Sequence, residues 1–127
     1  MLTDPIADFL TRLRNTSHAR RGELTVKSSR MIKAITELLL AKRFIEGFEE
    51  QTEGPYRNLA IRLRVDRDPL ELKRISKPGQ RIYIGHDEIK RVRNGLGMSI
   101  ISTNRGILSG EDAQKEKVGG EFICEVY

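Results

Sequence analysis

The sequence NGLGMSIISTNRG occupies residues 94–106 and carries the most information in the chain. Its apolar run, 98–101, is interrupted only by Ser99 and has the composition of a buried strand. Five small or polar residues follow the run: Ser102, Thr103, Asn104, Arg105 and Gly106. Hydroxyls, an amide and a guanidinium form hydrogen bonds, and glycine lets a backbone approach another surface closely. The stretch therefore predicts a rigid strand that presents a polar tip to a partner.

Composition limits the classes of protein that the 127 residues can represent. The formal net charge of +5 favours a polyanionic partner, with nucleic acid ahead of a membrane surface; a basic protein without such a partner is the alternative. The one cysteine, Cys124, excludes an intramolecular disulfide and a cysteine-based metal site, and it fits the reducing cytoplasm. No apolar stretch approaches the roughly 20 residues that span a bilayer, and the first residues lack a signal-peptide pattern. We therefore expect a cytoplasmic protein with no membrane partner.

Charged residues are unevenly distributed along the chain. Basic residues dominate 12–43 and 73–105, glutamates dominate 44–56, and acidic residues lead after 106. An evenly solvated charged surface would look more mixed. The two basic blocks therefore predict basic patches on two parts of the fold.

The first half of the sequence predicts a small α+β unit. The expected elements are a helix that begins after Asp4 and ends at Gly22, a strand at 23–27, a helix at 30–43 capped by Ser28 or Ser29, and a hairpin of strands at 44–51 and 58–66. Apolar residues recur at helical spacing in the helices and alternate in the strands. We therefore expect an α-β-α-β-β domain over 1–65, with two helices on one face of a three-stranded sheet.

The second half predicts a mainly β domain with one short helix. Residues 66–69 are polar and end in proline, which favours a linker before a domain at 70–127. Pro78-Gly79 is typical of the centre of a type II turn, and Ser109 with Asp112 indicates a short helix to about 117. The last strand, 121–127, is expected to alternate. One face would carry Phe122, Cys124 and Val126, and the opposite face would carry Glu121, Ile123 and Glu125.

The residue patterns of catalysis and metal binding are missing from the sequence. His18 and His86 have no partner at metal-ligand spacing, and no phosphate-loop motif is present. Ser102 lacks the flanking glycines and the nearby histidine of an activated nucleophile. We therefore expect no enzymatic activity, no metal and no cofactor.

Three features of the second half indicate RNA. The polar tip carries short donors and acceptors that reach base edges and 2′-hydroxyls in the shallow minor groove, although an ordinary β-turn has a similar composition. Basic residues flank the turn at 76–80 and place charge for phosphates: Lys73, Arg74, Lys77 and Arg81. Tyr83 among them can stack on a base, or it is a half-buried strand aromatic. No recognition-helix motif is visible, so structured RNA is favoured over DNA.

Basic residues also gather on the two predicted helices. Arg14, Arg20 and Arg21 lie towards the end of the first helix, where they either match the helix dipole or contact RNA. Arg30 and Lys33 lie near the start of the second helix, where cations oppose the dipole. Their position therefore favours a role in binding a partner.

Several segments resemble the bacterial form of the family of the eighth protein of the small ribosomal subunit. They occur in a consistent order from end to end: 4–15, 74–79, 81–83, 94–97, 102–106 and 118–121. The resemblance implies a two-domain ribosomal protein that binds the central domain of small-subunit rRNA directly during assembly, beside neighbouring small-subunit proteins. It also implies that some members repress translation by binding their own operon's messenger RNA.

The resemblance assigns roles to particular positions. In the family, a Ser-Thr-Ser-x-Gly loop inserts against the minor groove of an irregular rRNA helix, and the matching positions here are Ser102 to Gly106, with Arg105 variable and Asn104 in place of the usual Ser. Tyr83 matches an aromatic near the RNA. Gly119, Gly120 and Glu121 match a segment that supports the loop. The amino-terminal half touches rRNA through basic helix residues, for which we nominate Arg12, Arg14, Arg30 and Lys33.

Two other functions are compatible with the residues. A free RNA-binding regulator would use the same tip without joining the ribosome. An RNA-modifying enzyme would need a catalytic cluster, such as His86 beside Ser102 and a carboxylate. Co-sedimentation with ribosomal subunits separates the first alternative from a ribosomal protein.

Overall fold

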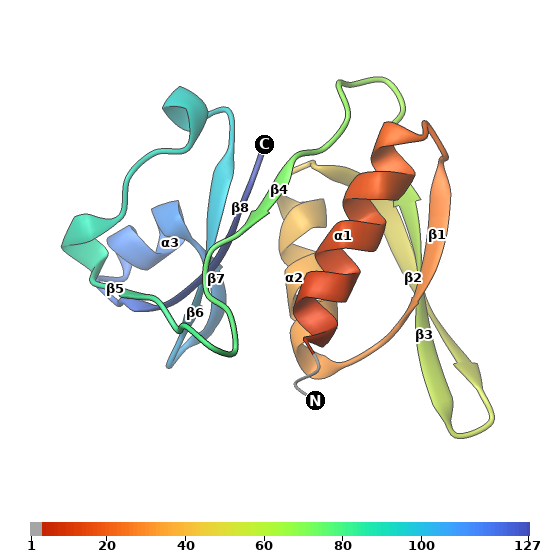
Figure 1. Cartoon of the computed structure of the whole chain (residues 1–127), viewed down its shortest axis with the longest axis horizontal. Helices are drawn as coiled ribbons and strands as arrows, with labels where there is room; N and C mark the ends of the chain where they lie inside the picture. The colour runs from red at the N-terminus through yellow and green to blue at the C-terminus, as the bar shows by residue number, and fades with distance from the viewer. Residues whose placement is uncertain (1–3) are drawn as a thin grey trace. The chain divides into compact units, whose positions relative to one another are not determined.

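The computed structural model describes residues 4–127, which divide into two compact units (Figure 1). One unit is 8–70, and the other consists of 71–127 together with the described residues up to Ala7. The predicted linker, 66–69, lies in the first unit, and the division into domains at 1–65 and 70–127 stays a prediction.

The first unit has the predicted α-β-α-β-β order. Its elements are α1 (Pro5–His18), whose first three residues are grouped with the other unit, β1 (Glu23–Lys27), α2 (Arg30–Ala41), β2 (Ile45–Glu53) and β3 (Tyr56–Leu63). The strands form an antiparallel sheet in the order β1-β3-β2, and the two helices lie on one face of it (Figure 1). The core joins the apolar stripes of the helices to the inward residues of β3, and its fully buried members include Phe9, Leu13, Ile35, Leu39, Leu59 and Ile61.

Side-chain caps fix where the helices begin. The Asp4 carboxylate accepts a hydrogen bond from the Ala7 amide at 3.0 Å, as a cap before Pro5 should. Ser29, the second of the two predicted candidates, accepts from the Ile32 amide at 3.2 Å and caps α2. The predicted Ser109 cap is also confirmed, because its hydroxyl accepts from the Asp112 amide.

The helix ends differ from the prediction. The helix α1 ends at His18, and the left-handed residue that closes it is Arg20, with φ 57°, so the prediction that Gly22 ends this helix is wrong. The amides of Arg20 and Arg21 donate to carbonyls of the last turn, which is the Schellman arrangement. The same arrangement places Arg43 (φ 64°) after α2 and Lys117 (φ 56°) after the third helix. Glycine is the usual residue there, and a side chain in this conformation costs about 1 kcal/mol.

The second unit is the predicted mainly β sheet with one short helix. Its strands are β4 (Leu72–Arg74), β5 (Tyr83–Ile84), β6 (Met98–Thr103), β7 (Gly106–Ser109) and β8 (Gly120–Val126), and its helix is α3 (Gly110–Lys115). Short 3-10 turns occupy His86–Glu88 and Arg93–Gly95. The sheet order is β4-β8-β6-β7, and β5 pairs with β8. Ile101 of β6 packs with Ile89 and with Ala113 of α3, so the central strand is anchored in a core.

Two local predictions for this unit are wrong. The register of β8 against β6 jumps at a β-bulge, since Ile100 pairs with Cys124 and Ile101 pairs with Phe122. Directly paired residues share a face and successive residues of β6 alternate, so the bulge puts Phe122 and Cys124 on opposite faces, and the prediction that they share one is wrong. Gly79 is not in the left-handed region that a type II turn requires at this position.

Candidate nucleic-acid interface

The polar tip is a tight hairpin turn between β6 and β7. Thr103 pairs with Gly106, and Asn104 and Arg105 form the turn between them. Both turn residues have negative φ, whereas Gly106 has φ +103°. This combination is typical of a type I turn followed by a left-handed glycine. The glycine is needed for its backbone angle, because a Cβ there would meet nothing within 4 Å.

The hydroxyl of Thr103 holds the turn together. Its Oγ1 accepts a hydrogen bond from the Arg105 amide at 3.0 Å and donates one to the Gly106 carbonyl at 2.9 Å. Such local bonds replace the ladder bonds that a turn lacks. Within the described part of the chain, the Ser102 hydroxyl and the Asn104 amide have no hydrogen-bond partner. Thr103 therefore positions the tip, and Ser102 and Asn104 present free polar groups.

Tyr83 and Ser102 lie in one row across the sheet. Glu121 of β8 pairs with Tyr83 of β5 on one side and with Ser102 of β6 on the other. Directly paired residues point to the same face, with Cβ atoms about 5 Å apart. Tyr83 is 72% exposed, so the alternative that it is a half-buried strand aromatic is wrong. The row joins an exposed ring to a free hydroxyl on one rigid surface.

Glu121 lies between them and is already neutralised within the protein. Its Oε2 accepts a hydrogen bond from the Ser76 hydroxyl and one from Arg81 Nη1 at 2.9 Å. Burial alone would raise the pKa of this carboxyl, but the two hydrogen bonds and the charge of Arg81 outweigh it and hold the pKa below its usual value. Ser76 also accepts from the Ile82 amide, which ties the 76–80 turn to this network. Such internal contacts are expected of a carboxylate that supports the loop and does not itself bind RNA.

The two glycines before Glu121 let the strands approach closely. A Cβ on Gly120 would lie 2.0 Å from the Ser102 carbonyl oxygen, and one on Gly119 would lie 2.4 Å from the Ile84 carbonyl oxygen. Both neighbours are backbone atoms of paired strands, so they cannot move aside cheaply. Close strand packing beside Ser102 therefore requires glycine at both positions. Sequence patterns did not reveal this steric reason for the Gly-Gly pair.

The basic residues predicted around this surface have different environments. Lys77 is exposed, and Arg81 is half exposed beside Glu121. Arg105 pairs with Glu116 at 3.2 Å next to the tip. Arg74 is only 13% exposed and pairs with Asp4 at 3.4 Å, so the prediction that it offers charge to phosphates is wrong. Of these four basic residues, Lys77, Arg81 and Arg105 thus remain accessible.

The amino-terminal nominees lie in the other unit. Arg12 donates from Nη2 to the Thr25 carbonyl at 2.9 Å, which joins α1 to β1, and Lys33 pairs with Glu50 at 3.2 Å. Arg14 is half-buried and Arg30 is exposed. The structure thus separates the predicted residues into two groups, one in each unit.

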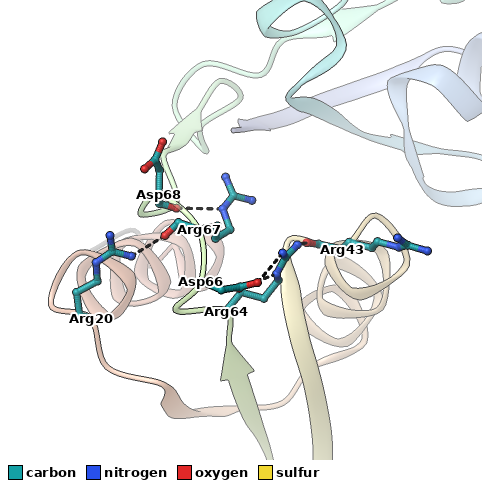
Figure 2. Close-up of polar contacts among 6 residues, drawn as sticks. All are labelled: Arg20, Arg43, Arg64, Asp66, Arg67 and Asp68. Carbon is teal, nitrogen blue, oxygen red and sulfur yellow. Dashed lines mark hydrogen bonds and ion pairs between the residues drawn. The ribbon is translucent and has the colours of Figure 1, made fainter.

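One group of basic residues was not nominated from the sequence. At one end of the first unit, Arg20 donates to the main-chain carbonyl of Arg67, and Arg64 donates to that of Arg43 (Figure 2). The sequence alone places Arg20 only among several basic residues at the end of a helix. The basic composition of 12–43 pointed to this end of the chain, but only the fold brings β3 and its following segment to the helix ends.

Two kinds of site are not found among residues 4–127. No cluster of three or more His, Cys, Asp or Glu side chains is arranged to hold a metal ion. None of the described helices has the length and apolar character needed to cross a membrane.

The fold and this surface define an α+β protein with a preorganised polar tip. The family model described as ribosomal protein S8 matches residues 4–127. The chain therefore belongs to the ribosomal protein S8 family, which confirms the family resemblance and the prediction that the chain is not an enzyme.

Individual relatives match over at least 97% of their length and are named small ribosomal subunit protein uS8. The protein from Sorangium cellulosum is 47% identical, with 100% of both chains covered. That from Desulforudis audaxviator is 45% identical, again with 100% of both chains covered. That from Caldicellulosiruptor bescii is 47% identical over 98% of this chain and 97% of its own.

Proposed function

We propose that this chain is a structural constituent of the small ribosomal subunit that binds the central domain of its rRNA directly and helps the subunit assemble. Its partners are this rRNA and the neighbouring small-subunit proteins. One observation carries the proposal: the β6–β7 tip is a rigid turn whose free polar groups lie beside an exposed tyrosine.

The tip suits the shallow minor groove of an RNA helix. The Ser102 hydroxyl and the Asn104 amide each offer a donor and an acceptor on short side chains, which reach 2′-hydroxyls and base edges only when the backbone comes close. Gly106 and the tight turn keep that approach open. Tyr83, in the same row, offers a ring face to an unstacked base. Asn104 is longer than the Ser usual in the family, so its contact is rearranged.

The two predicted domains divide the work. Residues 70–127 read the RNA through the tip, and residues 1–65, joined to them by 66–69, add phosphate contacts through Arg12, Arg14, Arg30 and Lys33. Phosphate contacts strengthen binding without reading sequence. Glu121 supports the tip from within, since its charge is neutralised by Ser76 and Arg81 and would repel a phosphate.

A gel shift with a fragment of the rRNA central domain tests the proposal. Ser102→Ala should weaken binding about tenfold, the value of one hydrogen bond of about 1.4 kcal/mol. Thr52→Ala, which removes an exposed hydroxyl from β2 in the other unit, is the matched control and should bind normally. Normal affinity of a doubly substituted Ser102→Ala, Thr103→Ala chain would refute the assignment of the tip.

Repression of its own operon's messenger RNA is the second candidate, and it uses the same surface. A messenger that imitates the rRNA site would offer the same minor groove to the tip. Competition between the two RNAs for one site is the expected result, with Ser102→Ala weakening the binding of both about tenfold. A chain that acts only as a free regulator would remain in the soluble fraction when ribosomal subunits are sedimented.

A further inference from the structure

Arg105 in the turn of the tip is held by a carboxylate at the end of the short helix α3. Its Nη1 donates a hydrogen bond to Glu116 Oε1 at 3.2 Å. The guanidinium group is 58% exposed and the carboxylate 40%, so both are open to solvent and to a ligand. Among residues 4–127, neither side chain has another charged partner. Loss of this carboxylate would therefore free the positive charge of Arg105.

The fold fixes the place of Glu116. This residue caps the C-terminus of α3. The helix itself is anchored, because Ala113 is fully buried and Gln114 Nε2 donates to the Ile89 carbonyl at 2.7 Å. A negative charge at this end of a helix opposes the dipole, so helix stability does not explain the carboxylate. Its ion pair with Arg105 is the better explanation.

The helix α3 and the exposed polar groups of the tip lie on opposite faces of β6. Ile101 packs against α3, whereas the next residue, Ser102, lies in the row that carries Tyr83. Successive residues of a strand point to opposite faces. The ion pair thus holds Arg105 on the α3 side, away from the row.

Both arginines that flank the row and the tip are therefore neutralised within the protein. Arg81 pairs with Glu121 at 2.9 Å, and Arg105 pairs with Glu116. An unpaired cation at the tip would attract the phosphates of any RNA, because backbone contacts carry no sequence information. A hydrogen bond from Ser102, by contrast, requires a groove whose shape brings a partner atom close. A charge-balanced tip thus binds through shape and hydrogen bonds.

We propose that Glu116 is a specificity-determining residue, which keeps Arg105 paired and so weakens binding of the tip to RNA that lacks the fitting groove. The proposal rests on the proposed function, because it requires the tip to read RNA. Discrimination of this kind comes from weakening the wrong complexes rather than from strengthening the right one. In the right complex the groove meets Ser102 on the opposite face of β6, so Arg105 stays with Glu116.

Equilibrium binding of the full chain to two RNAs tests the proposal: the central-domain rRNA fragment and an unrelated RNA hairpin of equal length. The variant is Glu116→Gln, which keeps the size of the side chain and removes its charge. The matched control is Glu111→Gln, because Glu111 lies on the same helix but pairs with Lys115 at 3.3 Å. A double variant, Arg105→Gln with Glu116→Gln, removes the freed cation as well, and circular dichroism verifies the fold of each variant.

The chain with Glu116→Gln should bind the unrelated hairpin about threefold more tightly at low salt, which corresponds to the free energy of an exposed ion pair. Its slope of log affinity against log salt for that hairpin should steepen by about 0.7–0.9, the value of one additional phosphate contact. Affinity for the fragment should stay nearly unaltered, so the preference for the fragment should fall about threefold. Glu111→Gln should leave this preference unaltered, and the double variant should bind the hairpin as the unaltered chain does.

Other outcomes overturn the proposal and show which claim has failed. Equal changes for Glu116→Gln and Glu111→Gln, or none for either, would show that the pair with Arg105 does not discriminate. A similar gain for both RNAs would show that Arg105 reaches phosphates in the right complex too, and weaker binding of the fragment would show that Glu116 aims Arg105 at the RNA. In each case the tip assignment stands if Ser102→Ala binds the fragment weakly. If the unaltered chain prefers neither RNA, the proposed function fails as well.

Discussion

Thr103→Val should loosen the tip without changing its shape. Valine has nearly the same volume and branching as threonine, so it removes only the hydroxyl. The hydroxyl makes two hydrogen bonds, to the Arg105 amide at 3.0 Å and to the Gly106 carbonyl at 2.9 Å. The change therefore tests whether preorganisation of the turn, rather than direct contact by Thr103, supports RNA binding.

The expected effect follows from those two bonds. Each intramolecular hydrogen bond contributes about 0.5–1.5 kcal/mol, and exposed ones lie at the lower end. Two of them give about 1–2 kcal/mol, which corresponds to a loss of about 5- to 30-fold in RNA affinity if the bound turn must be ordered again. Global stability should change much less, because a hairpin tip can open locally.

Filter binding of the central-domain fragment, measured for Thr103→Val and Thr103→Ser, is the assay. Serine keeps the hydroxyl and should restore most of the affinity, whereas valine should not. Amide hydrogen exchange should show faster exchange at Arg105 in the valine variant. Unaltered RNA affinity of Thr103→Val would refute the positioning role. A loss for serine with none for valine would show that the methyl group matters instead of the hydroxyl.

Two further predictions concern the support beneath the tip. Gly120→Ala should destabilise the second unit by about 1–3 kcal/mol in urea unfolding, because its Cβ would meet the Ser102 carbonyl oxygen; Gly22→Ala, with open space around it, should not. The folded pKa of Glu121 is depressed, so its contribution to stability should be present above the unfolded pKa of about 4.3 and be lost as pH falls through the folded value. Glu121→Gln should flatten that acid limb of the stability curve, and an unchanged limb would assign it to other carboxylates.

The sequence predicted the fold well wherever local patterns decide it. Apolar spacing predicted both helices of the first unit, and alternation predicted the hairpin of β2 and β3. The bulge that puts Phe122 and Cys124 on opposite faces could not be predicted, because alternation carries no information about an extra residue in one of two paired strands. The left-handed Arg20 was missed because glycine normally takes that position, and Gly22 lay close by.

The candidate surface was predicted as a set of residues but not as a mechanism. Composition and resemblance led to the tip and to Tyr83. The internal role of the Thr103 hydroxyl and the burial of Arg74 depend on tertiary contacts that no local pattern encodes. The hydrogen bond from Arg20 to the Arg67 carbonyl depends on the same kind of information, since the two residues lie 47 positions apart in sequence.

Ultraviolet crosslinking of the full chain to the rRNA central-domain fragment, with both the peptides and the nucleotides identified, tests the central claim most directly. We predict crosslinks from Tyr83 and from the peptide that carries residues 102–106, to nucleotides that line one minor groove. Crosslinks confined to residues 8–70, with none from Tyr83 or the tip, would contradict the account.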